Sequence, residues 1–213
     1  MTSAEYFEQM LTPEERRMMA NLNAPGDIQQ FLDSVPYSAD PFYRCPLRVL
    51  RDRIAHCFDG AVFAAAALQR IGFPPLILEL LPNDRDDDHL IAPFKIDGHW
   101  GALAKSNFVG LRFREPVYRN LRELVMSYFE HYYNIAREKT LRGYALPLNL
   151  ATLDRYHWLT DDATMDRIAT QLDRRRKIPL ITPAMSARLL LVDERSYLAE
   201  LSGANEAGLF QPD

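Results

Sequence analysis

An apolar run from residue 61 to residue 71 is the feature that most limits how this chain can fold. The run is rich in alanine and leucine, and it meets no helix breaker until Gly72, which is followed by Pro74 and Pro75. This composition and this stop signal predict a helix that ends at the glycine. Because a helix that is apolar nearly all round is a buried one, we expect a central helix around which the rest of the chain packs.

A cysteine lies at the start of this predicted helix. Cys57 precedes the apolar run, and Asp59 follows it in the first turn, where a carboxylate suits the positive end of the helix dipole. Free backbone N–H groups at a helix start lower the pKa of a thiol, so Cys57 is a candidate nucleophile. The alternative is that Cys57 is a small buried hydrophobic residue, as free cysteines often are. The other cysteine, Cys45, is interpreted as structural.

The composition is that of an ordinary soluble domain. With 213 residues, 47% of them hydrophobic, the chain is long enough for a single domain with a sizeable core. We place the core at about residues 45–115, with helical extensions at 1–44 and 116–213. The formal net charge of −4 argues against a general binder of nucleic acid or of an anionic membrane.

Targeting signals and cysteine pairing patterns are not found. The first residues are acidic where a signal peptide would be basic and then apolar, and no apolar run is long enough to span a membrane. We therefore expect a cytoplasmic protein. Two cysteines at positions 45 and 57 form neither a disulfide framework nor a metal or redox motif, so free thiols are expected.

Three short β-prone runs follow the helix. Residues 76–81 are an apolar run between prolines, and residues 89–96 and 99–104 are joined by Asp97 and Gly98, a strong signal for a hairpin. Pro93 indicates a bulge or an edge position for the first hairpin strand. The order predicts an α+β fold in which the central cysteine-bearing helix packs on an antiparallel sheet, with additional N- and C-terminal helices.

Acidic residues lie in and after the first of these strands. Glu79 interrupts the apolar run, and it either faces solvent or lies near the functional site. The loop at residues 82–88 holds four aspartates, but it lacks the glycine and the final glutamate of a calcium-binding loop. No metal site and no cofactor are therefore expected.

The remaining part of the chain is expected to be mostly helical. Alternation at residues 107–116 predicts an extension of the sheet, and the pattern at 117–133 predicts one amphipathic helix. Its aromatic residues are interpreted as packing, with a substrate groove as the alternative. Further helices are predicted at residues 163–172, 182–191 and 193–201.

The order of these features resembles the transglutaminase-like superfamily, papain-like cysteine enzymes in which a cysteine on a helix faces a histidine on the sheet. The resemblance is carried by Cys57, the helix end at residues 70–72, His89 at the start of the next strand, and the sequence Asp-Gly-His-Trp at residues 97–100. It covers roughly residues 45–107. The resemblance depends on the combination of spacing and order, not on any single motif.

The resemblance implies that Cys57 is the nucleophile and His89 its base. A thiol needs such a base near neutral pH, because at its free pKa it is mostly protonated. Attack on an amide or isopeptide carbonyl would form a thioester, which water or a second amine would release. Backbone N–H groups at the helix start would stabilise the oxyanion. The implied partner is a peptide, a protein or a small amide, and the oligomeric state is left open.

The third member of the expected triad is where the sequence departs from the family. The aspartate that follows Trp100 in the family falls at Ala104 here, and alanine cannot orient an imidazole. Ser106 or Asn107 would then accept a hydrogen bond from His89. Otherwise the pair acts as a dyad, or the site is degenerate.

Two further histidines, His56 and His99, are alternative candidates for the base. His99 lies in the hairpin turn and is expected to be exposed. His56 precedes Cys57 directly and points differently on the same backbone, so we expect it at the surface or in a supporting role.

Three functions remain open from the sequence. The leading hypothesis is a metal-independent cysteine enzyme that cleaves or transfers an acyl group, and its alternative is an inactive binding or scaffold protein of the same fold. A purely helical interaction module would require residues 76–104 not to form a sheet.

Overall fold

The framework of the molecule is a seven-stranded antiparallel sheet. The computed structural model describes residues 2–212. Its strands are β1 (Leu76–Pro82), β2 (His89–Ile96), β3 (His99–Leu103), β4 (Arg114–Tyr118), β5 (Leu141–Ala145), β6 (Leu148–Asn149) and β7 (Lys177–Pro179). Hydrogen bonding joins them in the order β4-β3-β2-β1-β5-β7, and β6 pairs with β1. The α+β class expected from the sequence is confirmed.

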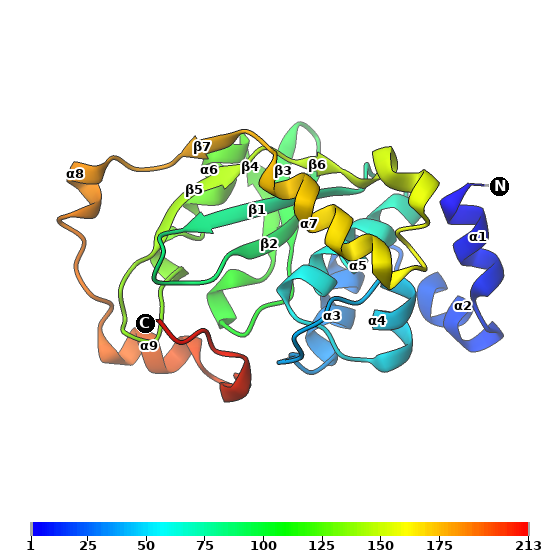
Figure 1. Cartoon of the computed structure of the whole chain (residues 1–213), viewed down its shortest axis with the longest axis horizontal. Helices are drawn as coiled ribbons and strands as arrows, with labels where there is room; N and C mark the ends of the chain where they lie inside the picture. The colour runs from blue at the N-terminus through cyan, green and yellow to red at the C-terminus, as the bar shows by residue number, and fades with distance from the viewer. Residues whose placement is uncertain (1, 213) are drawn as a thin grey trace.

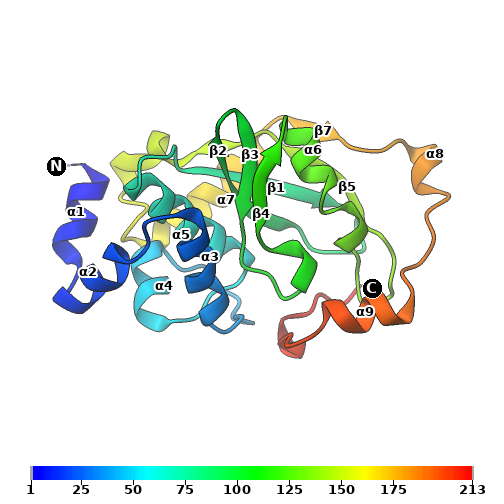
Figure 2. The ribbon, with the colours of Figure 1, turned by 180° about the vertical axis from the view of Figure 1, so that it is seen from behind.

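Helices lie mainly at one end of the sheet and along its faces (Figures 1 and 2). They are α1 (Ser3–Met10), α2 (Pro13–Ala20), α3 (Pro25–Ser34), α4 (Pro46–Asp52), α5 (Cys57–Arg70), α6 (Leu121–Met126), α7 (Met165–Asp173), α8 (Pro183–Ser186) and α9 (Glu194–Glu200). The N-terminal pair α1 and α2 and the short α8 lie at opposite ends of the molecule. Within residues 2–212, no helix is long and apolar enough to cross a membrane.

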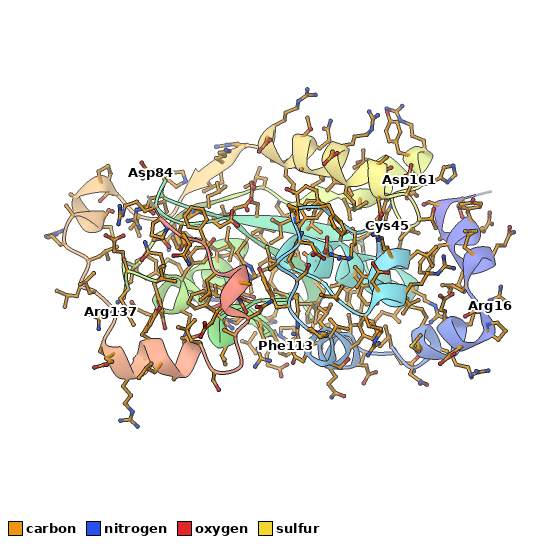
Figure 3. The ribbon with its side chains drawn as sticks, turned by 60° about the horizontal axis from the view of Figure 1, so that its bottom comes forward. Arg16, Cys45, Asp84, Phe113, Arg137 and Asp161 are labelled. Atoms are coloured by element: carbon orange, nitrogen blue, oxygen red, sulfur yellow. The ribbon has the colours of Figure 1, made fainter. Side chains whose placement is uncertain are left out.

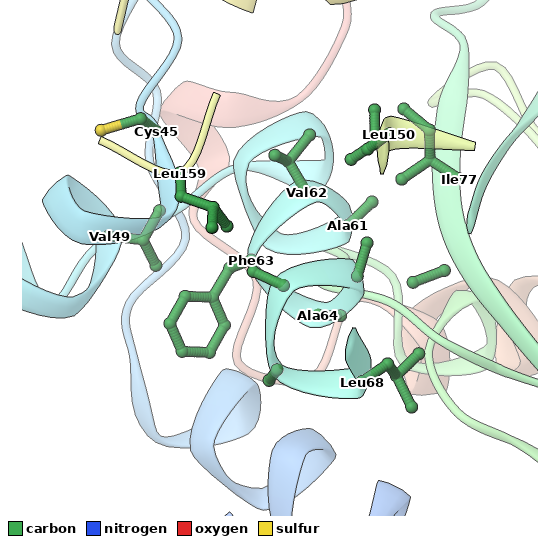
Figure 4. Packing of buried hydrophobic residues seen from close by; sticks show 14 of the residues in the cluster. Cys45, Val49, Ala61, Val62, Phe63, Ala64, Leu68, Ile77, Leu150 and Leu159 are labelled. Atoms are coloured by element: carbon green, nitrogen blue, oxygen red, sulfur yellow. The ribbon is translucent and has the colours of Figure 1, made fainter. Parts of the chain in front are cut away.

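The central buried helix predicted from the sequence is α5. Every residue from Phe58 to Leu68 in this helix is buried, as expected for a helix without a polar face. It packs on β2 and against α3 and α4. Figure 4 shows its turns between Ile77 and Leu150 on one side and Val49 and Leu159 on the other. The sheet and the neighbouring helices thus fix the position of the Cys57 end.

Both faces of the sheet are covered by separate parts of the core. Side chains alternate along a strand, so one face presents residues that pack with α5, such as Leu90, Ala92 and Phe94. The other face presents residues such as Leu80 and Ile91, which pack with α6 and the aromatic residues that follow it. The interpretation of most of those aromatics as packing fits this second part of the core.

The β2–β3 hairpin forms as predicted, but Pro93 does not mark an edge. Asp97 and Gly98 have φ values of 49° and 82°, which are the positive values that a type I′ turn requires. β2 lies in the interior of the sheet between β3 and β1. Pro93 is tolerated there because the pairing of β2 with β1 ends at Ile91, so the missing N–H lies beyond that ladder.

The second half of the chain contributes more to the sheet than the sequence predicted. Residues 117–133 do not form one helix: β4 includes the first two of them, and α6 ends at Met126. β5, β6 and β7 come from the stretch that was expected to be a helical extension. Short strands of two to five residues carry too little periodicity to be recognised, and neighbouring strands decide their conformation. Since β1, β2 and β3 form a sheet, a purely helical module is excluded.

Candidate active site

Cys57 is the first residue of α5, and a reciprocal cap made by its neighbours fixes this helix start. The Asp59 N–H donates to His56 Nδ1 at 3.5 Å, and the His56 N–H donates to Asp59 Oδ2 at 3.4 Å. This is the geometry of a capping box with histidine in the cap position. His56 therefore supports the nucleophile's helix, as expected, and burial lowers the pKa of its imidazole to about 4.

A buried ion cluster holds the segment that leads into α5. Asp59 is fully buried, accepts a hydrogen bond from the Arg44 N–H at 2.7 Å, and lies 3.6 Å from the Arg44 guanidinium. Burial raises the pKa of the Asp59 carboxyl to about 6, although these partners act in the opposite direction. Arg44 also pairs with Asp40 and Asp52. Because Arg44 is itself buried, the cluster fixes the loop beside the cysteine.

The Cys57 thiol does not have the lowered pKa that its helix position predicted. Burial raises the pKa of this thiol above its ordinary value, and the negative charges of Asp88 and Asp87 raise it further. Sγ lies 4.0 Å from the backbone carbonyl oxygen of Asp88. The expectation was wrong because desolvation and the two carboxylates outweigh the effect of the helix start. Cys57 is therefore protonated at neutral pH in this arrangement.

Cys45 differs from Cys57 in exposure. Its side chain is buried at the start of α4, and its N–H donates to Asp162 at 2.8 Å. Burial raises the pKa of the Cys45 thiol to about 12. Figure 3 shows Cys45 between Arg16 and Asp84, which lie toward opposite ends of the molecule. Both cysteines are free.

His89 is buried at the start of β2 with one ring nitrogen bonded to the backbone. Nε2 lies 2.8 Å from the carbonyl oxygen of Leu111. Since a carbonyl only accepts, Nε2 carries the proton and Nδ1 keeps a lone pair. Burial lowers the pKa of the imidazole to about 4, so His89 is neutral at pH 7. This is the protonation state and the tautomer that a general base requires.

The residues predicted to orient His89 are engaged elsewhere. The Ser106 hydroxyl accepts from the Phe108 N–H at 3.0 Å. The Asn107 side chain donates to the Asn205 carbonyl at 2.8 Å and accepts from the Asn205 N–H at 2.7 Å. Both functions of the Asn107 amide are thus used by one backbone segment, and the Leu111 carbonyl takes the position behind the imidazole. A backbone carbonyl has no sequence signature, so no motif could have identified it.

Ala104, at the position of the expected aspartate, is held away from any catalytic role. Its carbonyl accepts from Gln29 Nε2 at 3.0 Å, and its N–H donates to Gln29 Oε1 at 3.1 Å. The next side chain, Lys105, donates to the Leu32 carbonyl at 2.9 Å and to the Val35 carbonyl. These bonds tie the end of β3 to α3 rather than to His89.

Cys57 and His89 line one small cavity of about 60 Å³, together with Ser106 and Asn107. Within residues 2–212 no hydrogen bond joins the cysteine to the histidine. A cleft of about 920 Å³ also reaches Cys57, and it runs between the start of α5 and α7. The structure therefore brings the sequence-predicted residues to one cavity, with a larger approach for substrate beside it.

Tyr37 is a site residue that the sequence analysis missed. It lines both the small cavity and the cleft together with Cys57, and its hydroxyl lies near the backbone N–H and the thiol of that cysteine. Burial is the main cause that raises the pKa of the Tyr37 phenol well above its ordinary range, and the charge of the nearby Cys57 is the second. The residue lies in a proline-rich connector, where one tyrosine gives no signal of a function. Its position beside the Cys57 N–H makes it a candidate second donor to an oxyanion.

The segment at residues 204–210 lies over the site. Asn205 donates from its side chain to the Tyr37 carbonyl at 3.0 Å, in addition to its two bonds with Asn107. A Cβ on Gly208 would lie 2.9 Å from the Tyr37 ring. Gly208, Leu209 and Phe210 line both the small cavity and the cleft. We call residues 204–210 the strap; it runs below the strands in Figure 1.

The structure also shows where His99 and Glu79 lie. His99 is exposed in the hairpin turn, with Nδ1 3.0 Å from the Asp97 carbonyl oxygen. Glu79, whose position the sequence left open, is buried and lines the cleft beside Cys57. Among residues 2–212, no group of three or more His, Cys, Asp or Glu side chains has a geometry that could hold a metal ion.

Comparison with known proteins gives distant structural likenesses only. No family model matches the chain, and no curated protein matches it. The chain is similar to a structure of LapG from Legionella pneumophila, with 14% identity and a TM-score of 0.44, covering 78% of this chain and 97% of that one. An EGTA-treated form gives 15% identity and a TM-score of 0.42, covering 78% and 97%. A calcium-bound form gives 14% and 0.42, covering 78% and 98%.

Proposed function

We propose that the protein is a cysteine enzyme that cleaves or transfers an acyl group at an amide or isopeptide bond, with Cys57 as nucleophile and His89 as base. The observation that carries this proposal is the state of His89. It is neutral, its Nε2 proton is fixed on the Leu111 carbonyl, and it shares a cavity with a cysteine at a helix start. A proton acceptor and a nucleophile are then available without any carboxylate at position 104.

The reaction begins with proton transfer. As Sγ of Cys57 attacks the substrate carbonyl carbon, Nδ1 of His89 accepts the thiol proton. The charge that develops on the carbonyl oxygen is stabilised by backbone N–H groups at the start of α5 and by the Tyr37 hydroxyl. When the C–N bond breaks, the amine leaves with the proton from His89. The product of this half-reaction is a thioester on Cys57.

Release of the acyl group uses the same residues. Water or a second amine attacks the thioester carbonyl and gives up its proton to His89, and the thiolate leaves and takes that proton back. The alternative of an inactive scaffold was suggested by Ala104. The Leu111 carbonyl lies where it can accept from His89 in place of the missing aspartate, which supports the active enzyme over that alternative.

A pair of histidine variants tests the proposal. In His89→Gln, the side-chain amide can still donate to the Leu111 carbonyl, but no base remains. We expect the rate of Cys57 alkylation by iodoacetamide at neutral pH to fall by about tenfold or more, since general bases contribute at least that much. His99→Gln is the matched control and should leave the rate unchanged. Equal rates in wild type and His89→Gln would remove His89 from the mechanism.

A further inference from the structure

The cleft beside Cys57 carries an excess of negative charge. Seven acidic residues line it: Asp40, Glu79, Asp87, Asp88, Asp162, Asp166 and Asp173. Two of them are neutralised, since Asp40 pairs with Arg44 and Asp162 pairs with Arg48. The other five form no ion pair with any residue in the described part of the chain. This charge is concentrated where α7 faces β1 and the start of β2.

Glu79 is the most unusual of these acids. Its side chain is only 6% exposed, and its Oε2 atom has no hydrogen-bond partner among residues 2–212. A buried carboxylate oxygen without a partner is costly, because it has lost water and gained nothing in exchange. Register places Glu79 opposite Leu90, on the face of the sheet that packs against α5. The Glu79 side chain therefore belongs to the wall of the cleft that leads to Cys57.

The Asp88 side chain lies beside that of Glu79, and both line the cleft. Both groups only accept hydrogen bonds when ionised, so a shared proton or a cation with its own N–H donors would satisfy both. Burial, followed by contact with Glu79, raises the pKa of Asp88 to about 7. Near neutral pH the Asp88 carboxyl is thus close to giving up its proton, and a positively charged donor could replace it. Asp173, from α7, adds its negative field from across the cleft.

We propose that the Glu79–Asp88 pair is a subsite for a positively charged side chain, lysine or arginine, of a peptide substrate whose scissile carbonyl lies at Cys57. This inference rests on the proposed function, because that function supplies the peptide substrate. A cation with its own N–H donors fits two facing carboxylates better than a metal ion does, because the acids here do not form a metal-holding group. The cleft volume of about 920 Å³ leaves room for a side chain beside the cysteine.

Occupation of the subsite would also activate the nucleophile. The charges of Asp88 and Asp87 are among the causes that raise the pKa of Cys57. A bound cation cancels part of this negative field, so the pKa of the thiol falls when the right substrate is present. The thiol is then more reactive toward its own substrate than toward neutral compounds.

Charged thiol reagents test the subsite on the full chain. Three methanethiosulfonates are compared: cationic aminoethyl, anionic sulfonatoethyl and neutral methyl. Each forms a disulfide with Cys57 and releases methanesulfinate, and peptide mapping separates Cys57 from Cys45. In wild type we expect the cationic reagent to modify Cys57 at least about tenfold faster than the anionic one, with the neutral reagent between them.

Isosteric variants locate the origin of this preference. Glu79→Gln and Asp88→Asn should each bring the ratio of cationic to neutral rates close to one, and the neutral reagent corrects for any change in the reactivity of the thiol itself. Glu115→Gln removes the same charge from an exposed position on β4, outside the cleft, and should keep the wild-type ratio. Thermal unfolding of each variant verifies that it is folded.

The outcomes separate the subsite from the proposed function. If Cys57 reacts with the neutral reagent but shows no charge preference, or if the preference survives in both cleft variants, the subsite is overturned and the cysteine enzyme stands. If none of the three reagents modifies Cys57 faster than Cys45, the subsite and the nucleophile are both overturned. A preference lost in Glu79→Gln and Asp88→Asn and kept in Glu115→Gln supports the subsite.

Discussion

Asn107 separates two explanations of the site at the scale of one residue. The sequence made it a partner of His89, whereas the structure uses its amide to hold the strap at Asn205. The two roles predict opposite effects of the same substitution. If Asn107 orients the base, its removal slows the reaction of Cys57. If it holds the strap, its removal uncovers the cysteine.

We expect Asn107→Ala to increase the rate at which neutral iodoacetamide alkylates Cys57 by about threefold to tenfold. The substitution removes two hydrogen bonds to the strap, each of which contributes about 1 kcal/mol, and solvation of the freed groups offsets part of this loss. Asn205→Ala should give an increase of the same sign, because its side chain bonds only to the strap and to the Tyr37 carbonyl. Slower alkylation in Asn107→Ala, with faster alkylation in Asn205→Ala, would show that Asn107 orients His89, as the sequence analysis predicted.

The sequence located the important side chains but not their partners. Cys57 and His89 could be found because a cysteine before an apolar helix and a histidine opening a strand are visible in the order of residues. The Leu111 carbonyl and the Tyr37 hydroxyl could not be found. Every residue has a backbone carbonyl, so the residue type does not mark it, and a single tyrosine in a connector belongs to no recognisable motif. The raised pKa of Cys57 was missed since it depends on burial and on Asp88, neither of which spacing reveals.

At the scale of elements, the close packing of α5 on the end of β3 fixes Cys57 in place. A Cβ on Gly60 would lie 2.3 Å from the Cβ of Lys105, which is much closer than two carbon atoms can approach. Lys105 cannot yield easily, because its ammonium group is bonded to backbone carbonyls of the α3 region. A glycine is therefore required at position 60, because α5 and the residue that follows the end of β3 approach each other so closely.

Gly60→Ala should lower the free energy of unfolding by about 1–3 kcal/mol, because overpacking outweighs the better helix propensity of alanine. Gly26→Ala is the matched control: it lies in α3, and nothing stands within 4 Å of its added Cβ. That variant should be unchanged or more stable by up to about 1 kcal/mol. Chemical denaturation measures both. Equal stability of the two variants would show that α5 does not press on β3 as described.

At the scale of the whole molecule, the fold holds the carboxyl groups of Asp86, Asp87 and Asp88 in surroundings that favour their protonated form. Burial raises the pKa of Asp86 and of Asp87 to about 6, and that of Asp88 to about 7. In the unfolded chain these groups titrate near their ordinary value of about 4. Between the two values the folded state binds more protons than the unfolded state, so their contribution to stability is lost as pH rises through this range.

Asp88→Asn removes one of these titrations. Relative to wild type, the variant should gain free energy of unfolding on the order of 1 kcal/mol between about pH 4 and about pH 8, a value reduced for solvent screening. The lowered pKa values of His56 and His89 act in the opposite direction below pH 6.5, and they cancel in this comparison. Asp84→Asn, at an exposed position in the same loop, is the control. A difference that does not change with pH would contradict the burial of Asp88.

The general architecture could be predicted from the sequence because long signals determine it. The largely apolar run before Gly72 and the Asp-Gly hairpin specify the central helix and the strands on which it packs. The pairing of β5 in the sheet and the strand β7 could not be predicted, since each strand is short and its pairing depends on its neighbour in the sheet. The strap at residues 204–210 has no local signature either, as its position depends on Asn107 and Tyr37, far away in sequence.

Acyl transfer through Cys57 can be tested most directly with an activated ester, p-nitrophenyl acetate, followed by peptide mapping of the intact chain. We predict an acetyl group on Cys57 in wild type, continued release of nitrophenol over many turnovers, and loss of both in Cys57→Ala, with His89→Gln strongly slowed. Acetylation confined to lysine residues, or nitrophenol release that is equally fast in Cys57→Ala, would contradict the assignment of Cys57 as the nucleophile.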